Sequence, residues 1–253
     1  MIKMKKFNFL AIFLQLFISS FVYAFDCENE KNIDYVLNQV DLEFSPRYLI
    51  SCKVNPQNEN QLLMAYAVQQ YDEEKEIGDY QLYILGVNHK NRKVDYFYAI
   101  EDRLPSDAVE LSSITWDFAP YFVKPSYRIV GLRLNYSLRS QVHPYHSTVL
   151  NLYDLDNKKH ILDSLIVSEY SVDTDTRCNA DIEERNSVLV MRPTTTHGYF
   201  DIQVRSRLEH YEMRGDEENC FEINRKTSKQ NFLLKFNGVR YVIPKSYEKD
   251  YQY

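Results

Sequence analysis

The chain has 253 residues and a formal net charge of −6, with 30 Lys and Arg against 36 Asp and Glu. The basic residues form no cluster after residue 24, which argues against binding to nucleic acid or to an anionic membrane surface, because both need grouped positive charges. The 21 Tyr and 14 Phe favour half-buried β-strands over helices.

Residues 1–24 have the pattern of a secretory signal peptide. Three lysines within the first six residues precede an apolar run that ends near Val22. Val22 and Ala24 place small residues where a signal peptidase prefers them. We therefore predict cleavage after Ala24, a periplasmic or secreted protein, and no membrane span in the remainder. Cleavage would change the formal net charge from −6 to −9. An uncleaved N-terminal anchor is the alternative.

Four cysteines follow the predicted cleavage site. An even number of cysteines in an exported chain favours disulfides. Of the three possible pairings, Cys27–Cys52 with Cys178–Cys220 closes the shortest loops and is the pairing we expect. Zinc binding by the cysteines is the alternative, but no C-x-x-C or C-x-x-H spacing supports it.

One short helix and many strands are expected along the chain. Apolar residues recur at helical spacing within Asn32–Asp41, whereas most later segments alternate with the strand period of two. Asn237-Gly238 is a strong signal for a tight hairpin turn. The predicted strands are Gln61–Tyr71, Tyr80–Val87, Val94–Ile100, Ser113–Val123, Tyr127–Tyr136, Thr148–Asp154, His160–Tyr170, Asn186–Met191, Tyr199–Arg207, Asn231–Phe236 and Arg240–Ile243.

These elements predict an all-β, mainly antiparallel fold with at most one short N-terminal helix. A sandwich, a barrel or a propeller-like stack of hairpins would each fit this order. Pro, Gly and Ser nowhere cluster into a linker, so we expect one domain over residues 25–253.

The hairpin at 113–136 places charges in its two apolar runs. With a three-residue loop at 124–126, Asp117 would face Arg133, and Tyr121 would face Ile129. The apolar residues around them would then share one face. We expect Asp117 and Arg133 to form a cross-strand ion pair; a ligand site made of Asp117, Tyr121 and Arg133 is the alternative.

The letters D-F-A-P-Y (Asp117–Tyr121) and G-L-R (Gly131–Arg133) resemble a hairpin of secreted, uncharacterised bacterial β-rich proteins. The resemblance covers this hairpin alone. It implies export and a β-rich fold, and it assigns no reaction and no functional residue.

Two segments have metal-ligating residue types. His143 and His146 form an H-x-x-H pattern that Zn²⁺ or Cu²⁺ could use with a further ligand. Asp173 and Asp175 begin an acidic loop that resembles a calcium loop, but Cys178 stands where that loop needs glycine. We expect no cofactor, with Zn²⁺ or Ca²⁺ bound at these residues as the alternative.

No pattern in the sequence defines a catalytic set. There is no G-x-S-x-G nucleophile turn and no glycine loop for phosphate. The sequence therefore favours an exported binding protein with a protein partner, a basic one by charge, such as an immunity or inhibitor protein for an exported enzyme. An exported hydrolase or metal enzyme using His143 and His146, and a structural envelope component, are the alternatives.

Overall fold

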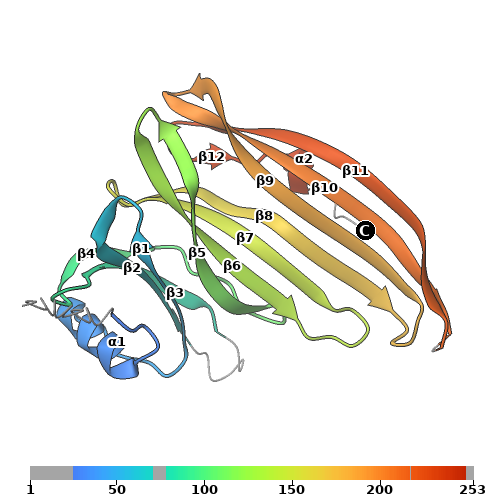
Figure 1. The fold of residues 1–253 in the computed structure, drawn as a ribbon, viewed down its shortest axis with the longest axis horizontal. Helices are drawn as coiled ribbons and strands as arrows, with labels where there is room; N and C mark the ends of the chain where they lie inside the picture. Colours follow the sequence, from blue (N-terminus) through green and yellow to red (C-terminus); the bar gives the residue numbers. More distant parts are fainter. Residues whose placement is uncertain (1–24, 71–77, 217, 249–253) are drawn as a thin grey trace, which may run out of the picture.

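The computed structural model describes residues 25–70, 78–216 and 218–248. The predicted signal peptide lies outside these ranges. Within them, no helix is long and apolar enough to cross a membrane. The fold is all-β: two antiparallel sheets carry one short N-terminal helix and a single C-terminal turn of helix, which confirms the predicted class (Figure 1).

The small sheet has four strands in the order β1-β2-β3-β4, and the large sheet has eight in the order β12-β11-β10-β9-β8-β7-β6-β5. Every neighbouring pair of strands is antiparallel and adjacent in the chain. The helical elements are α1 (Glu30–Leu37), η1 (Asn38–Val40) and α2 (Lys245–Glu248). The strands are β1 (Tyr48–Asn55), β2 (Asn58–Gln69), β3 (Tyr80–Asn88), β4 (Val94–Ala99), β5 (Glu110–Lys124), β6 (Tyr127–Leu138), β7 (Tyr145–Asp154), β8 (Lys159–Thr174), β9 (Ala180–Thr196), β10 (Tyr199–Gly215), β11 (Cys220–Phe236) and β12 (Tyr241–Val242).

The small sheet is buried on both faces. On β2, Met64 and its alternate neighbours pack against α1, whereas Leu63 and Ala65 pack against the large sheet. Helix α1 begins after Asn29, whose side chain accepts hydrogen bonds from two backbone amides of the first turn. The disulfide Cys27–Cys52 then ties the segment before α1 to β1. The result is a helix, the small sheet and one end of the large sheet in three layers (Figure 1).

Trp116 on β5 joins the two sheets. Its indole N–H donates to the carbonyls of Ser51 (3.1 Å) and Leu63 (3.0 Å), and its backbone N–H donates to Ser51 Oγ (3.2 Å). The side chain is only 2% exposed and lies among apolar residues of β2, β3, β5 and β6. Trp116 therefore combines a large buried area with satisfied polar groups at the inter-sheet boundary.

A second core lies within the large sheet. It collects buried residues from β5 to β12 and is closed by Tyr247 of α2, whose hydroxyl donates to the Ile166 carbonyl. Lys124 at the tip of the β5–β6 hairpin lies over the ring of Tyr199, at 4.2 Å from its centroid. The sheet therefore curls until the tip of its first hairpin reaches the β9–β10 hairpin (Figure 1).

The register of the β5–β6 hairpin differs from the prediction along most of its length. Near the turn, Tyr121 pairs with Ile129 as predicted, but an irregularity between Asp117 and Tyr121 shifts the pairing by two residues from Asp117 back to Ser113. Asp117 therefore pairs with Gly131 instead of Arg133. Since a shift of two preserves the faces, the apolar face expected from the sequence is retained.

Two differences in the strand assignment have identifiable causes. The predicted strands omit β1, which is an edge strand. Its Tyr48, Ile50 and Cys52 recur with the strand period of two, but their side chains are only partly buried. Strands β9 to β11 are also much longer than predicted, because their outer halves carry polar residues on both faces and lose the hydrophobic alternation.

Replacement of Trp116 by Ala should lower the free energy of unfolding by about 3–5 kcal/mol, because a cavity forms and two carbonyls lose their donor. Denaturation by urea would measure this. Val188→Ala is the matched control, since Val188 is 60% exposed and its loss should change stability by less than about 0.5 kcal/mol. A similar small effect for both variants would contradict the inter-sheet role of Trp116.

Candidate functional site: a cleft at the distal end of the large sheet

The distal end is the end of the large sheet at the β6–β7, β8–β9 and β10–β11 loops, remote from α1 (Figure 1). The β6–β7 loop is held along β8 there, because the Val172 N–H donates to the Pro144 carbonyl (3.1 Å) and the Thr174 N–H to that of Val142 (2.9 Å). The loop therefore extends the sheet and forms one wall of a cleft.

A row of directly paired residues crosses five strands of this end. Leu138 pairs with Tyr145, Tyr145 with Ser171, Ser171 with Glu183, and Glu183 with His210. Directly paired residues project from the same face of a sheet. All five line a cleft of about 640 Å³, a volume that accepts a small ligand or a partner's side chain. The described residues that line it are Leu138, His143, Pro144, Tyr145, Ser171, Val172, Asp173, Asp181, Glu183 and His210.

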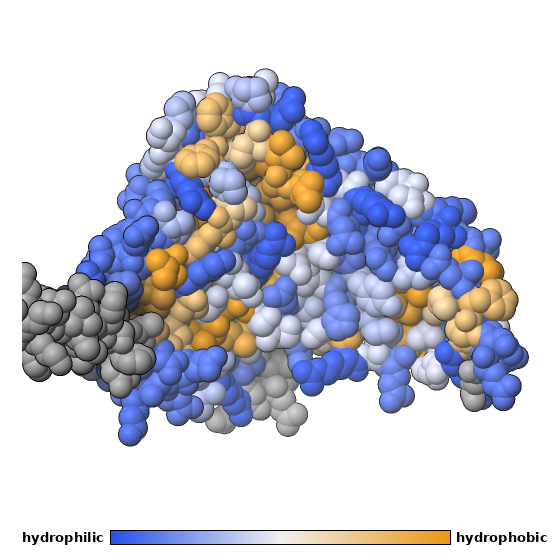
Figure 2. Space-filling model, in the orientation of Figure 1, coloured by the Kyte–Doolittle hydropathy of each residue, from blue (hydrophilic) through white to orange (hydrophobic). Residues whose placement is uncertain are grey.

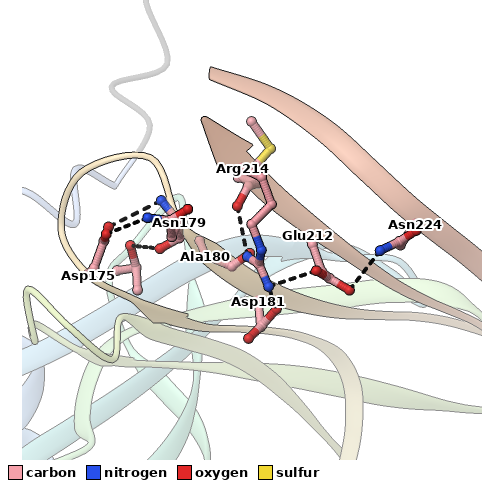
Figure 3. Close-up of polar contacts among 9 residues, drawn as sticks. Asp175, Asn179, Ala180, Asp181, Glu212, Arg214 and Asn224 are labelled. Carbon is pink, nitrogen blue, oxygen red and sulfur yellow. Dashed lines mark hydrogen bonds and ion pairs between the residues drawn. The ribbon is translucent and has the colours of Figure 1, made fainter. Parts of the chain in front are cut away.

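Two residues closer to the strand ends, the next row on the same face places carboxylates opposite one another. Asp173 pairs with Asp181, and Asp181 pairs with Glu212. Like charges at directly opposite positions destabilise a sheet. Arg214 partly offsets this, since its Nη2 lies 2.8 Å from Asp181 Oδ1 and 2.7 Å from Glu212 Oε2 (Figure 3). No Lys or Arg is among the described residues that line the cleft, so it is acidic.

The β8–β9 loop beside the cleft is fixed in place. The disulfide Cys178–Cys220 ties it to the start of β11. The Asp175 carboxylate accepts hydrogen bonds from the side-chain and backbone nitrogens of Asn179 (2.7 and 3.1 Å; Figure 3). These bonds hold the pKa of Asp175 below its ordinary value. Both disulfides are those expected from the sequence.

Glu183 lies in an unfavourable environment for its charge. Burial raises the pKa of its carboxyl above the ordinary value, Glu169 adds to this rise, and His210 opposes it. Groups whose ionisation is disfavoured in the free protein are typical of binding and catalytic sites. The cleft therefore holds a negative charge that a cation would relieve.

The structure brings together some of the predicted metal ligands and separates others. His143 Nδ1 lies 3.5 Å from Asp173 Oδ1, with both side chains largely exposed. His146 instead stacks on Tyr170, because it follows Tyr145 on β7 and projects from the opposite face. Asp175 is engaged within its own loop. Over the described ranges, no three His, Cys, Asp or Glu side chains are grouped to hold a metal ion.

The predicted ion pair of Asp117 and Arg133 forms despite the changed register. Arg133 Nη2 lies 2.7 Å from Asp117 Oδ2, which also accepts from the Tyr121 hydroxyl (2.9 Å), while the Ala119 N–H donates to Oδ1 (3.0 Å). Burial alone would raise the pKa of Asp117, but these contacts outweigh it and lower the pKa. Both carboxylate oxygens are thus used within the hairpin, which favours a structural role.

The surface of the distal end is mainly polar (Figure 2). Figure 2 shows apolar side chains where the β5–β6 hairpin and strands β9 to β11 converge, and mainly hydrophilic side chains over the strands beyond, apart from an apolar cluster at the far tip. Phe221, the second residue of β11, is 54% exposed.

Most cleft residues were not predicted as site residues. Tyr145, Ser171, Glu183 and His210 lie far apart in the sequence, and only the strand register aligns them. The adjacent pair Glu183-Glu184 does project to opposite faces as the strand period requires, since Glu184 accepts from Tyr211 (2.7 Å). His143 and Asp173 are the predicted residues that belong to the cleft.

The comparisons with known proteins return no match from family models, curated proteins or solved structures. The resemblance of the β5–β6 hairpin to secreted bacterial proteins therefore stays a prediction. The case for a function rests on the geometry of the cleft.

Glu183→Gln should raise the free energy of unfolding at pH 7. Because the folded state raises the pKa of Glu183, its charge opposes folding at neutral pH, and this penalty is absent once acid protonates the carboxyl in both states. We expect a gain below about 1 kcal/mol, since the group is partly solvated. The gain should vanish well below pH 4.5. Urea denaturation at pH 7 and at a pH well below 4.5 would measure this gain in the free energy of unfolding. Glu43→Gln, at an exposed position, is the control.

Asp117→Asn should lower the free energy of unfolding at pH 7 by about 1–3 kcal/mol, because Arg133 loses its charged partner. The folded-state pKa of Asp117 is lowered, so its contribution is present above the ordinary value of 3.8 and is lost as the pH falls through the folded value. The difference in the free energy of unfolding between the variant and the unaltered chain should therefore become smaller in acid. A difference that is constant from pH 7 to pH 3 would contradict this account.

Proposed function

We propose that this chain is an exported binding protein that receives a basic segment of a partner protein in the distal cleft. The observation that carries the proposal is the paired set of carboxylates around a 640 Å³ cleft without Lys or Arg in its described lining. Complementary charge accelerates the approach of a partner and selects its sign.

The rigidity of the cleft supports a binding role. Its walls are strands and a loop hydrogen-bonded to a strand, and the neighbouring loop is held by a disulfide. A preorganised site loses little conformational entropy when its ligand binds. Like charges opposite one another destabilise the free protein, and such an arrangement is common where function competes with stability.

Export supports a partner outside the cytoplasm. Two disulfides suit an oxidising compartment, and the N-terminal segment has the pattern of a signal peptide. An immunity protein for an exported enzyme is the concrete form that we propose, since it would hold a basic segment of that enzyme. The cleft is concave, so in this form the partner inserts into the protein.

Ser171→Arg should abolish capture of the partner from an extract of the extracytoplasmic compartment, because it puts a bulky cation in the middle of the cleft. Ser228→Arg is the matched control, with the same change at an exposed position of β11. The measurement is the amount of each protein retained in stoichiometric ratio by immobilised bait. Equal retention by both variants, or no retained protein with folded, disulfide-bonded bait, would contradict the proposal.

A further inference from the structure

Glu169 is a buried carboxylate with an unused oxygen beside the cleft. It is 8% exposed, and its Oε1 accepts a hydrogen bond from the Tyr145 hydroxyl (2.7 Å). Its Oε2 is buried without a hydrogen-bond partner. A buried polar atom without a hydrogen-bond partner is unfavourable unless a ligand supplies one.

Glu169 is not itself a lining residue, but it projects from the face of the sheet that lines the cleft. It lies two residues before Ser171 on β8, so both side chains project from the same face. Tyr145, which lines the cleft, donates a hydrogen bond to Glu169. The charge of Glu169 also contributes to the raised pKa of Glu183. The cross-strand neighbour Arg185 places its guanidinium over the Tyr247 ring, 4.3 Å from the centroid.

We propose that the distal cleft binds a primary alkylammonium group, with Glu169 Oε2 as its innermost acceptor. This inference rests on the proposed function and names the chemistry of the group that enters. Glu183 and the Ser171 hydroxyl, on the same face, supply the further acceptors that an ammonium with three N–H donors needs.

The hydrogen bond from Tyr145 decides between the two common cationic side chains. A guanidinium binds a carboxylate best through two parallel hydrogen bonds, which require both oxygens. The Tyr145 hydroxyl donates to one oxygen of Glu169. Burial and the neighbouring Glu169 raise the pKa of Tyr145 to about 12, so this hydroxyl keeps its proton. The remaining single oxygen suits a compact ammonium.

The lining also suits the alkyl stem of such a group. Leu138, Pro144, Tyr145 and Val172 supply apolar surface around the acidic residues. A lysine side chain buries its methylene groups along apolar surface while its ammonium reaches a polar partner. The same chemistry is present in a free diamine, so the experiment below separates these two sources.

The test is an NMR titration of the full disulfide-bonded protein with blocked tripeptides Ala-X-Ala and with cadaverine. We expect saturable binding when X is lysine, with shifts at the amides of Tyr145, Ser171 and Glu183. The peptide with norleucine, which has the stem without the charge, should bind at least about 10-fold more weakly. The arginine peptide should also bind more weakly. Binding of the lysine peptide but not of cadaverine assigns a side chain as the source, and the reverse assigns a free amine.

Glu169→Gln should weaken binding of the amine probe about 10-fold or more, since it keeps the shape and the Tyr145 contact but removes the charge. Glu43→Gln removes an exposed glutamate of the η1–β1 connection and should leave the affinity unchanged. If Glu169→Gln does not fold, Glu183→Gln replaces it, with a smaller loss expected.

Three results would overturn the inference: no saturable binding of either amine, arginine or norleucine peptides binding as well as lysine, or unchanged affinity in the folded Glu169 variant. The inference and the proposed function can fail separately. A partner captured by the unaltered protein and lost with Ser171→Arg, together with no amine binding, would leave the docking function intact and remove only the alkylammonium chemistry.

Discussion

Burial of the β5–β6 hairpin against the small sheet is the interaction on which the rest of the molecule depends. Trp116 fills the boundary and satisfies carbonyls of β1 and β2, while Val130 and Leu132 bring β6 to the same core. The opposite face of the hairpin, through Tyr121 and neighbouring residues, belongs to the core inside the curled sheet. One hairpin therefore connects the core between the sheets with the core inside the curled sheet.

None of the described apolar clusters extends into the distal end. The described apolar clusters are built largely from the parts of the strands nearer the small sheet and the C-terminal helix. Beyond them, the strands are stabilised by backbone pairing, by Arg214 between two carboxylates and by Cys178–Cys220. Few side chains there are buried in an apolar cluster, so acidic residues can gather around a cleft at a tolerable loss of stability.

The two acidic sites illustrate how partners decide the role of a carboxylate. Asp117 has both oxygens occupied by its own hairpin and a lowered pKa, so it stabilises the fold. Glu183 has a raised pKa, and Glu169 has an unpartnered buried oxygen. The properties of Glu183 and Glu169 are those expected of a cation-binding site in the free protein, because binding supplies the missing hydrogen bonds.

The sequence by itself determined the all-β class, the helix at its start, the apolar face of the β5–β6 hairpin and the pairs Cys27–Cys52 and Cys178–Cys220. Local periodicity and loop length carry that information. It did not determine the two-residue shift that sets Asp117 opposite Gly131, nor the row from Tyr145 to His210. Both depend on register irregularities between neighbouring strands, and local periodicity does not reveal where such an irregularity falls. The cleft is therefore a product of the tertiary structure, because residues far apart in sequence meet there only through strand register.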